Sequence, residues 1–324
     1  MSNTPSSAPL QRKISPRAWA LMALLALLWG CSFPATRAAL SEVGVLSTVA
    51  FRVAAGAMVL WAVIFVRQLP VRGGWRAVLI FAAMGFLNNI LPWSLIVWGQ
   101  QHIASGLAAI LNASTAIFTV TLAAAIFADE KLTGEKVVGV LLGLLGVTVV
   151  MGLGALATLD LTSLSQLAVL AASLCYACAG VFARRFLGGQ PPEVAAAGML
   201  SASSTVMIPA ALWFEGAPRL DYLPQTWVAL LYLGIVGSAL AFLCYYRVLR
   251  LAGAGNVSLV TLMIAPVSVI LGALIFGESL TLSDYAGFLL LAAGLLVIDG
   301  RVRNFLPPPL RAGGGSRVIP PPAE

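Results

Sequence analysis

Charged side chains are scarce in this sequence of 324 residues: only 10% are Asp, Glu, Lys or Arg, and histidine occurs once. Hydrophobic residues make up 60% of the chain, and the mean hydropathy is +0.96. A chain this apolar is not expected to fold around a core in water, which excludes an ordinary soluble protein. The stretches left outside the apolar runs are too short to bury a core, which excludes a soluble catalytic or nucleic-acid-binding domain.

Cysteine is also rare, with four residues that all fall inside apolar runs. Cys175 and Cys178 form a C-x-x-C pair, but no histidine or second pair lies near them, so small buried apolar residues are favoured over a metal or redox site. We expect no metal and no cofactor. The sequence has no cluster of catalytic residue types, so we do not expect an enzyme.

Apolar runs dominate what is present, and ten of them are long enough to cross a bilayer at about 20 residues each. If the N-terminus is cytoplasmic, all of the 19 basic residues except Arg37, Arg52 and Arg219 fall on the cytoplasmic side. The positive-inside rule therefore predicts an all-α integral membrane protein with ten transmembrane helices and both termini in the cytoplasm. The expected spans are 18–39, 44–66, 76–99, 103–127, 136–153, 163–183, 194–214, 225–246, 254–276 and 281–299.

The two halves of the chain repeat each other. Residues 126–133 recur as 275–281 at an offset of 148, and 104–106 recur as 253–255 at 149. The first span matches the sixth at 147, which pairs Trp29 with Tyr176, Phe33 with Gly180 and Arg37 with Arg184. Because five spans is an odd number, the second copy must be inverted, an architecture typical of secondary transporters. We expect a cytoplasmic tail (1–16), two five-helix repeats (17–153 and 162–300) and a disordered cytoplasmic tail (301–324).

Three short motifs follow one another along the chain: Leu-Leu-Trp-Gly at 27–30, Phe51-Arg52, and an acidic-Leu-Thr turn that occurs after both the fourth and the ninth spans. Over about residues 20–300 the chain resembles the EamA-type members of the drug/metabolite transporter superfamily. The resemblance implies a bacterial inner-membrane carrier, often an exporter of amino acids or related metabolites. It also implies a central cavity lined by spans one, three, four, six, eight and nine, and it leaves the substrate open.

Polar and aromatic side chains share faces of those six spans, at helical spacings. Polar groups inside a bilayer need partners or a water-filled cavity, so we interpret these faces as the cavity lining. The alternatives are hydrogen bonds between helices and interfacial anchoring by aromatic rings. The candidate lining residues are Trp29, Ser32, Asn89, Trp93, Asn112, Thr115, Thr119, Tyr176, Ser238, Phe242, Tyr245, Ser258, Thr261 and Ser268.

Arg52 is the one basic residue that lies well inside a span, because the others within the expected ranges stand near span ends. It is a candidate partner for a substrate carboxylate, but it could instead extend outward to the membrane surface or pair with Glu42. The second interpretation is favoured, because the resemblance places span two at the periphery.

Prolines and glycines suggest moving and fixed parts of the bundle. Pro34, Pro92 and Pro266 lie in cavity spans and are hinge candidates, although each could set a static bend. Glycines in spans five and ten offer small faces for a fixed seam. The repeated acids Glu130 and Glu278 are expected to cap or interlock the helix that follows each of them.

These features favour a secondary transporter that exports small polar metabolites, amino acids or their derivatives, by alternating access. The alternative is efflux of amphipathic drugs by proton antiport, but no Asp, Glu or His falls at mid-membrane to exchange the proton. The expected partners are a small-molecule substrate and the lipid bilayer, with no nucleic acid. A monomer is favoured and a dimer remains open. The sequence leaves the substrate, the flux direction and the coupling ion undetermined.

Overall fold

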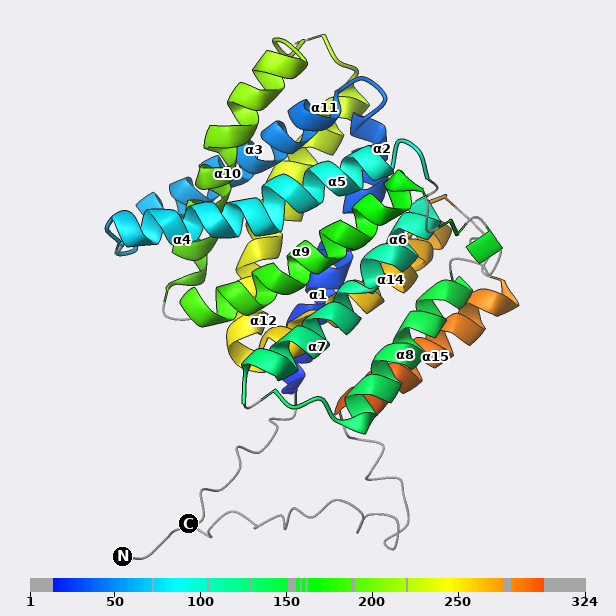
Figure 1. The fold of residues 1–324 in the computed structure, drawn as a ribbon. Helices are drawn as coiled ribbons and strands as arrows, with labels where there is room; N and C mark the ends of the chain where they lie inside the picture. The colour runs from blue at the N-terminus through cyan, green and yellow to red at the C-terminus, as the bar shows by residue number, and fades with distance from the viewer. Residues whose placement is uncertain are drawn as a thin grey trace, which may run out of the picture.

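The computed structural model describes residues 14–71, 73–103, 105–128, 130–150, 156–157, 159–160, 163–187, 190–219, 221–276 and 281–299. Within these ranges the side chains at 105, 106, 109, 268, 269, 271–276 and 299 are not described. The described residues form helices, turns and loops with no strand among them. The bundle is therefore all-α (Figure 1).

The first half provides five helical spans, some of which are interrupted. Span one begins with Ser15, whose hydroxyl accepts a hydrogen bond from the Ala18 N–H, and with Pro16 in the first helical turn, where proline is tolerated. The elements are α1 (Pro16–Gly30), α2 (Ser32–Ala39), α3 (Val45–Val66), α4 (Trp75–Gly85), the π-helix η1 (Phe86–Ile90), α5 (Leu91–Gly99), α6 (Ser105–Ala113), α7 (Thr115–Ile126) and α8 (Gly134–Val150).

The second half repeats this order. Two of its spans again begin with proline in the first turn, Pro192 and Pro224. The elements are α9 (Leu164–Phe186), α10 (Pro192–Phe214), α11 (Pro224–Leu231), the π-helix η3 (Tyr232–Leu240), α12 (Ala241–Ala252), α13 (Ala254–Val257), α14 (Val260–Phe276) and α15 (Leu282–Asp299). The predicted ten-span architecture is confirmed.

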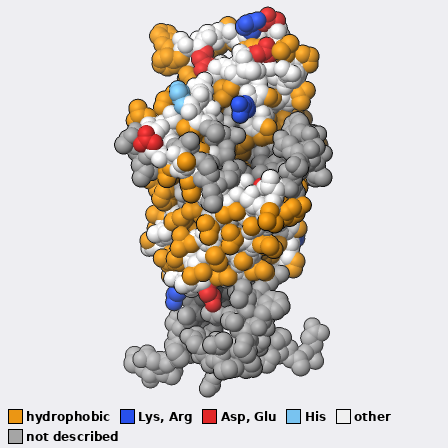
Figure 2. Space-filling model, turned by 90° about the vertical axis from the view of Figure 1, so that its right-hand side faces the viewer, with side chains coloured by type: hydrophobic (Ala, Val, Ile, Leu, Met, Phe, Trp, Pro, Cys, Tyr) orange, Lys and Arg blue, Asp and Glu red, His pale blue; other side chains and the backbone are white. Residues whose placement is uncertain are grey.

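The outer surface of the bundle is apolar. Within the described residues, six helical stretches of 22 to 29 residues are long and apolar enough by themselves to cross a bilayer. Large side chains such as Phe65, Trp213 and Leu289 are exposed on the outside. Figure 2 shows hydrophobic side chains over the middle of one face, with most of its charged side chains toward the upper and lower ends. Exposure of so much apolar surface to water is unfavourable, so this surface is suited to contact with lipid.

Several contacts between helices of the two halves have an equivalent contact between the matching helices, as an inverted repeat requires. α5 packs against α9 while α1 packs against α12, and α7 packs against α9 while α1 packs against α14. α3 contacts η3 just as α10 contacts α4, and α3 and α10 also pack on each other. The interior of the bundle is thus formed by elements of both halves.

α8 and α15 form an antiparallel pair at one edge of the bundle (Figure 1). Gly139 packs against Gly294 and Gly146 against Gly287, so closely that a Cβ on any of the four would lie under 3 Å from backbone of the facing helix. Small residues allow such close approach of helices in membranes. The glycine seam predicted from the sequence is therefore present, and it joins the last span of each half.

The two π-helices occupy matching places in the repeat. η1 interrupts span three and η3 interrupts span eight, and residues 86–90 shifted by the offset of 149 fall on 235–239, inside η3. A π-helix bonds residue i to i+5, so each of these turns holds one residue more than an α-helical turn. That extra residue changes which side chains face the interior.

Candidate substrate-binding cavity

A cavity lies between the two halves, with an empty volume of about 910 Å³ that includes the open space at its mouth. Spans one, three, four, six, eight and nine line it, together with Arg52 of span two. Of the residues predicted from the sequence, it brings together Trp29, Ser32, Arg52, Trp93, Asn112, Thr115, Thr119, Tyr176, Phe242, Tyr245, Ser258 and Thr261.

Aromatic rings from both halves form one wall of the cavity. The ring of Phe242 stacks on that of Trp93 with centroids 6.0 Å apart, and it meets Trp29 edge-on at 6.2 Å. Tyr245 lies 6.0 Å from Trp29 by the same measure. Offset-stacked and edge-to-face pairs of this kind are favourable beyond the area that they bury. The wall is suited to an apolar or aromatic group.

The opposite character is found on span four, where polar atoms have no partner. Asn112, Thr115 and Thr119 are buried and line the cavity, yet the Asn112 Oδ1 and both threonine hydroxyl oxygens make no hydrogen bond. Buried polar atoms are nearly always paired with protein or water. By contrast, the hydroxyls of Ser258 and Thr261 on span nine donate to carbonyls of their own span. The span-four stripe can therefore accept or donate hydrogen bonds to a bound molecule.

Asn89 does not line the cavity, contrary to the expectation from its spacing to Trp93. Its side chain is fully buried and donates from Nδ2 to the Ser203 Oγ on α10 at 2.9 Å, and Asn88 faces the cavity instead. The prediction placed Asn89 and Trp93 on one face because residues four positions apart share a face of an α-helix. The π-helix η1 adds one residue before Trp93, so the side chain five positions earlier shares its face.

The same change of register occurs in the second half. Ser238 does not line the cavity; its hydroxyl donates to the Leu233 carbonyl at 2.7 Å and accepts from Arg52. Five positions before Phe242 stands Gly237, whose carbonyl accepts from Trp29 at 3.2 Å and from Arg52 at 3.1 Å. A Cβ at Gly237 would lie 2.7 Å from the Ser32 Oγ, so glycine allows span one to approach this turn.

Arg52 lies in the interior, which corrects the expectation that it extends outward or pairs with Glu42. Its Cζ lies 3.8 Å from the centroid of the Trp93 ring, and the residue is only 8% exposed. Glu42 instead accepts hydrogen bonds from the Leu223 N–H and from the Thr226 hydroxyl. The helix α3 is not peripheral at this point, because it packs on both α10 and η3.

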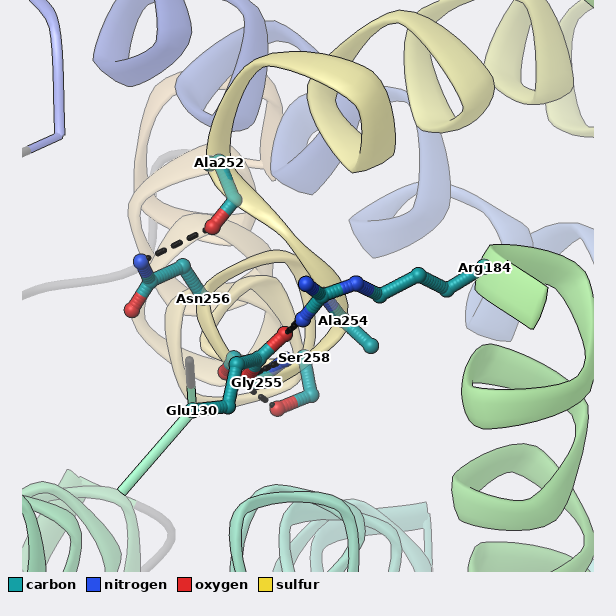
Figure 3. Close-up of polar contacts among 7 residues, drawn as sticks. All are labelled: Glu130, Arg184, Ala252, Ala254, Gly255, Asn256 and Ser258. Carbon is teal, nitrogen blue, oxygen red and sulfur yellow. Dashed lines mark hydrogen bonds and ion pairs between the residues drawn. The ribbon is translucent and has the colours of Figure 1, made fainter. Parts of the chain in front are cut away.

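Glu130 joins three spans at the end of the cavity where Ala254 lines it. Its carboxylate forms an ion pair with Arg184 of α9 and accepts hydrogen bonds from the N–H groups of Ala254 at 3.0 Å and Gly255 at 2.8 Å. Figure 3 shows Arg184 reaching across from α9 to Glu130. The acid was expected to cap or interlock the following helix, α8. It caps α13 of the other half instead, where helix N–H groups favour an anion.

The turn before α13 is shaped to admit this carboxylate. Gly253 has φ +85°, a conformation that favours glycine, and a Cβ there would lie 2.8 Å from the Glu130 Oε1. Lining residues at this end, such as Thr119 and Val257, are buried, whereas Phe33 and Gln100 at the far end are half-buried. We refer to Glu130, Arg184 and the N–H groups of Ala254 and Gly255 as the Glu130 cluster.

The three hinge candidates have different surroundings. Pro34 lies in α2, just after the break between α1 and α2 at Cys31, and Pro92 lies at the start of α5, directly after η1. Pro266 lies inside the uninterrupted helix α14. Pro34 and Pro92 thus adjoin irregular backbone, and the hinge role of all three stays a prediction.

Some expectations fall on residues outside the described part of the chain. The side chain of Ser268 is one of these, and Glu278, residues 1–13 of the first tail and the whole second tail are others. Sequence reasoning also missed Asn88, Val97 and Gly180, which line the cavity. The repeat gives a signal for Gly180, because it matches Phe33 at the offset of 147 and Phe33 also lines the cavity. No sequence pattern marks the π-helical turn that brings Asn88 inward.

Charge in the cavity is limited to one sign. Among the described residues that line it, Arg52 is the one with a charged side chain, and none is Asp, Glu or His. Among the described residues, no group of three or more His, Cys, Asp and Glu is placed so that it could hold a metal ion. The lining can therefore hold a molecule by one cation, unpaired polar atoms and aromatic surface.

An all-α bundle of two inverted repeats with a cavity between them defines a polytopic membrane transporter. Comparison with known proteins agrees, because the model of the EamA-like transporter family matches residues 17–152 and again 163–299. The chain belongs to the EamA-like transporter family. The resemblance inferred from the motifs is thereby confirmed.

Named relatives share about a quarter of their residues with this chain. The uncharacterized transporter YoaV of Bacillus subtilis is 23% identical, covering 84% of this chain and 92% of its own. A "probable amino-acid metabolite efflux pump" of Salmonella typhimurium is 26% identical (86% and 93%), and a "probable terminal-alkyne amino-acid exporter" of Streptantibioticus cattleyicolor is 27% identical (89% and 95%). A solved crystal structure matches with a TM-score of 0.74 at 21% identity, covering 89% of this chain and 98% of that one, which supports the fold.

Proposed function

We propose that this transporter exports amino acids or closely related small polar metabolites across the bacterial inner membrane. The observation that carries the proposal is the composition of the cavity lining: an aromatic wall, unpartnered polar atoms on span four and a single cation. Such a lining is suited to a molecule with a polar, zwitterionic end and an apolar side chain. Two relatives named for amino-acid efflux or export support this class of substrate.

Transport proceeds by alternating access, with the halves exchanging roles around the cavity. The Glu130 cluster supports this mechanism, because it ties spans four, six and nine together at one end of the cavity. By the distribution of basic residues this end faces the cytoplasm, as do both termini. In the conformation described here the cluster closes that side, and it must separate for substrate to enter from the cytoplasm.

Proton-coupled efflux of amphipathic cations is the competing function. A cationic drug would meet Arg52 in the cavity, and like charges at such close quarters repel strongly in a medium of low dielectric constant. The described lining offers no acid to bind the drug or to exchange a proton. We therefore favour neutral or zwitterionic substrates.

Metabolite profiling tests this function directly. Cells that overproduce the protein and cells that lack it are grown in parallel, and amino acids and related metabolites are measured in the cells and in the medium. One or a few amino acids should accumulate in the medium only when the protein is present, and they should then be transported into liposomes that contain it. Unchanged media together with resistance to unrelated toxic cations would contradict the proposal in favour of drug efflux.

A further inference from the structure

We infer that Arg52, held over Trp93, is the subsite that binds the carboxylate of the substrate. This inference rests on the proposed function and specifies its substrate class: carboxylates that carry an apolar side chain, α-amino acids above all. The guanidinium would hold the carboxylate, the aromatic wall would hold the side chain, and the span-four stripe would meet the amino group.

The charge of Arg52 is incompletely paired. A guanidinium carries five N–H donors, and here the Arg52 Nε donates to the Ser238 Oγ at 3.1 Å and one Nη2 hydrogen to the Gly237 carbonyl at 3.1 Å. No carboxylate within the described part of the chain pairs with it. A buried cation without a counter-charge is unfavourable, and the remaining donors belong to a side chain that lines the cavity. A substrate carboxylate would supply the missing charge.

Trp93 holds the guanidinium in a fixed orientation. The Arg52 Cζ lies 3.8 Å from the centroid of the indole ring, a cation–π contact, and the ring of Phe242 stacks on the same indole. A guanidinium fixed in this way suits bidentate pairing with a planar carboxylate. Because its orientation is already set, the Arg52 side chain loses little further conformational entropy on binding. The apolar part of the same molecule would then lie against the aromatic wall.

The repeat shows that packing alone does not require this charge. Met199 holds the position that matches Arg52 in the other half, at the offset of 147. Its sulfur accepts hydrogen bonds from the Asn88 Nδ2 and from the Tyr246 hydroxyl, both at 3.5 Å, so a neutral side chain joins the equivalent helices there. The two positions are structurally alike and chemically different. Binding of an anion explains why one of them carries a cation.

Binding measurements on the purified full-length protein in lipid nanodiscs test the inference. The probes are L-phenylalanine, 3-phenylpropanoate, which lacks the amino group, and phenethylamine, which lacks the carboxylate. Binding is followed by thermal stabilisation and by tryptophan fluorescence. We expect the two carboxylates to bind and phenethylamine to bind at least tenfold more weakly. Equal binding of phenethylamine, or no binding of either carboxylate, would overturn the inference.

The variant Arg52→Met places here the neutral residue that stands at the matching position of the other half, Met199. We expect it to lose at least tenfold in affinity for both carboxylates, whereas Arg52→Lys, which keeps the charge but not the planar fork, should lose less. Arg219→Met is the matched control, because Arg219 is exposed and pairs with Asp221 outside the cavity. Because Arg52→Met also removes the hydrogen bonds to Ser238 and Gly237, its unfolding without ligand is measured alongside. If the variant unfolds cooperatively and still binds both carboxylates normally, the inference is wrong.

These outcomes separate the inference from the proposed function. Export of amino acids that persists in Arg52→Met cells would refute the carboxylate subsite and leave the exporter function standing. Carboxylate binding that depends on Arg52, without any amino acid in the medium, would refute amino-acid export and leave the subsite standing.

Discussion

Asn88 and Gly237 hold matching positions 149 residues apart, and each lies on a π-helical turn beside the cavity. Asn88 lines the cavity with its side chain, whereas Gly237 offers its carbonyl to Trp29 and Arg52. The π-helical register thus places a polar group of each half next to the site.

This register makes neighbouring asparagines differ in their roles. We expect Asn88→Ala to weaken substrate affinity about tenfold, which corresponds to the ~1.4 kcal/mol of a lost polar contact. Asn89→Ala should leave the affinity unchanged and lower the free energy of unfolding by roughly 1–3 kcal/mol, because it removes the hydrogen bond to Ser203 in a fully buried place. Transport kinetics and thermal denaturation of the two variants check this. The opposite assignment would mean that span three is a regular α-helix.

The unpartnered atoms of span four predict a separation of stability from transport. Asn112→Ala and Thr115→Val remove polar atoms that make no hydrogen bond in the structure, so the melting temperature should stay the same or rise. Transport should fall about tenfold or more, since the substrate loses its partners. Thr148→Val, on α8 and outside the cavity lining, serves as the control and should transport normally. Normal transport in both cavity variants would show that this face does not touch the substrate.

Gly180 predicts a limit on substrate size. A Cβ there would meet only the Tyr245 hydroxyl at 3.6 Å and the Thr119 methyl at 3.8 Å, which are ordinary contacts, so Gly180→Ala should transport normally. Gly180→Phe places in this half the ring that Phe33 already provides in the other, and it should fill part of the cavity. We expect it to exclude aromatic amino acids while small ones are still transported. Competition by amino acids of increasing side-chain size measures this, and an unchanged order of preference would contradict it.

The Glu130 cluster predicts control of access from the cytoplasm. Arg184→Gln removes the ion pair and should favour the conformation that is open at this end. A cysteine at Ser258, in a background that lacks the four native cysteines, should then react faster with an impermeant maleimide in inside-out vesicles. We expect an increase of about tenfold, from the ~1.5–3 kcal/mol of a charged hydrogen bond.

Arg185→Gln is the matched control for this experiment. Arg185 is the neighbouring residue on α9, it is exposed, and it takes no part in the cluster. Its substitution should leave the labelling rate unchanged. Equal labelling in Arg184→Gln and Arg185→Gln would mean that the cluster does not close the cytoplasmic side.

The amino-acid sequence by itself determined the architecture of this transporter. Apolar runs of membrane-spanning length, the asymmetry of basic residues and the repeat at an offset of 147–149 together required ten spans in two inverted halves. The same repeat brought many of the lining residues to light, because Asn112 and Thr119 in span four coincide with polar residues of span nine at the offset of 149. These are properties of local hydropathy and spacing, which the chain carries before it folds.

Only the tertiary structure decided which groups meet inside the bundle. A π-helical turn has no sequence signature, so the choice of Asn88 over Asn89 depended on how span three packs against its neighbours. Arg52 is interior because α3 packs on the opposite half, and Glu130 caps α13 because the inverted repeat brings these distant segments together. A buried charge takes the partners that folding brings within reach, and sequence distance does not specify them.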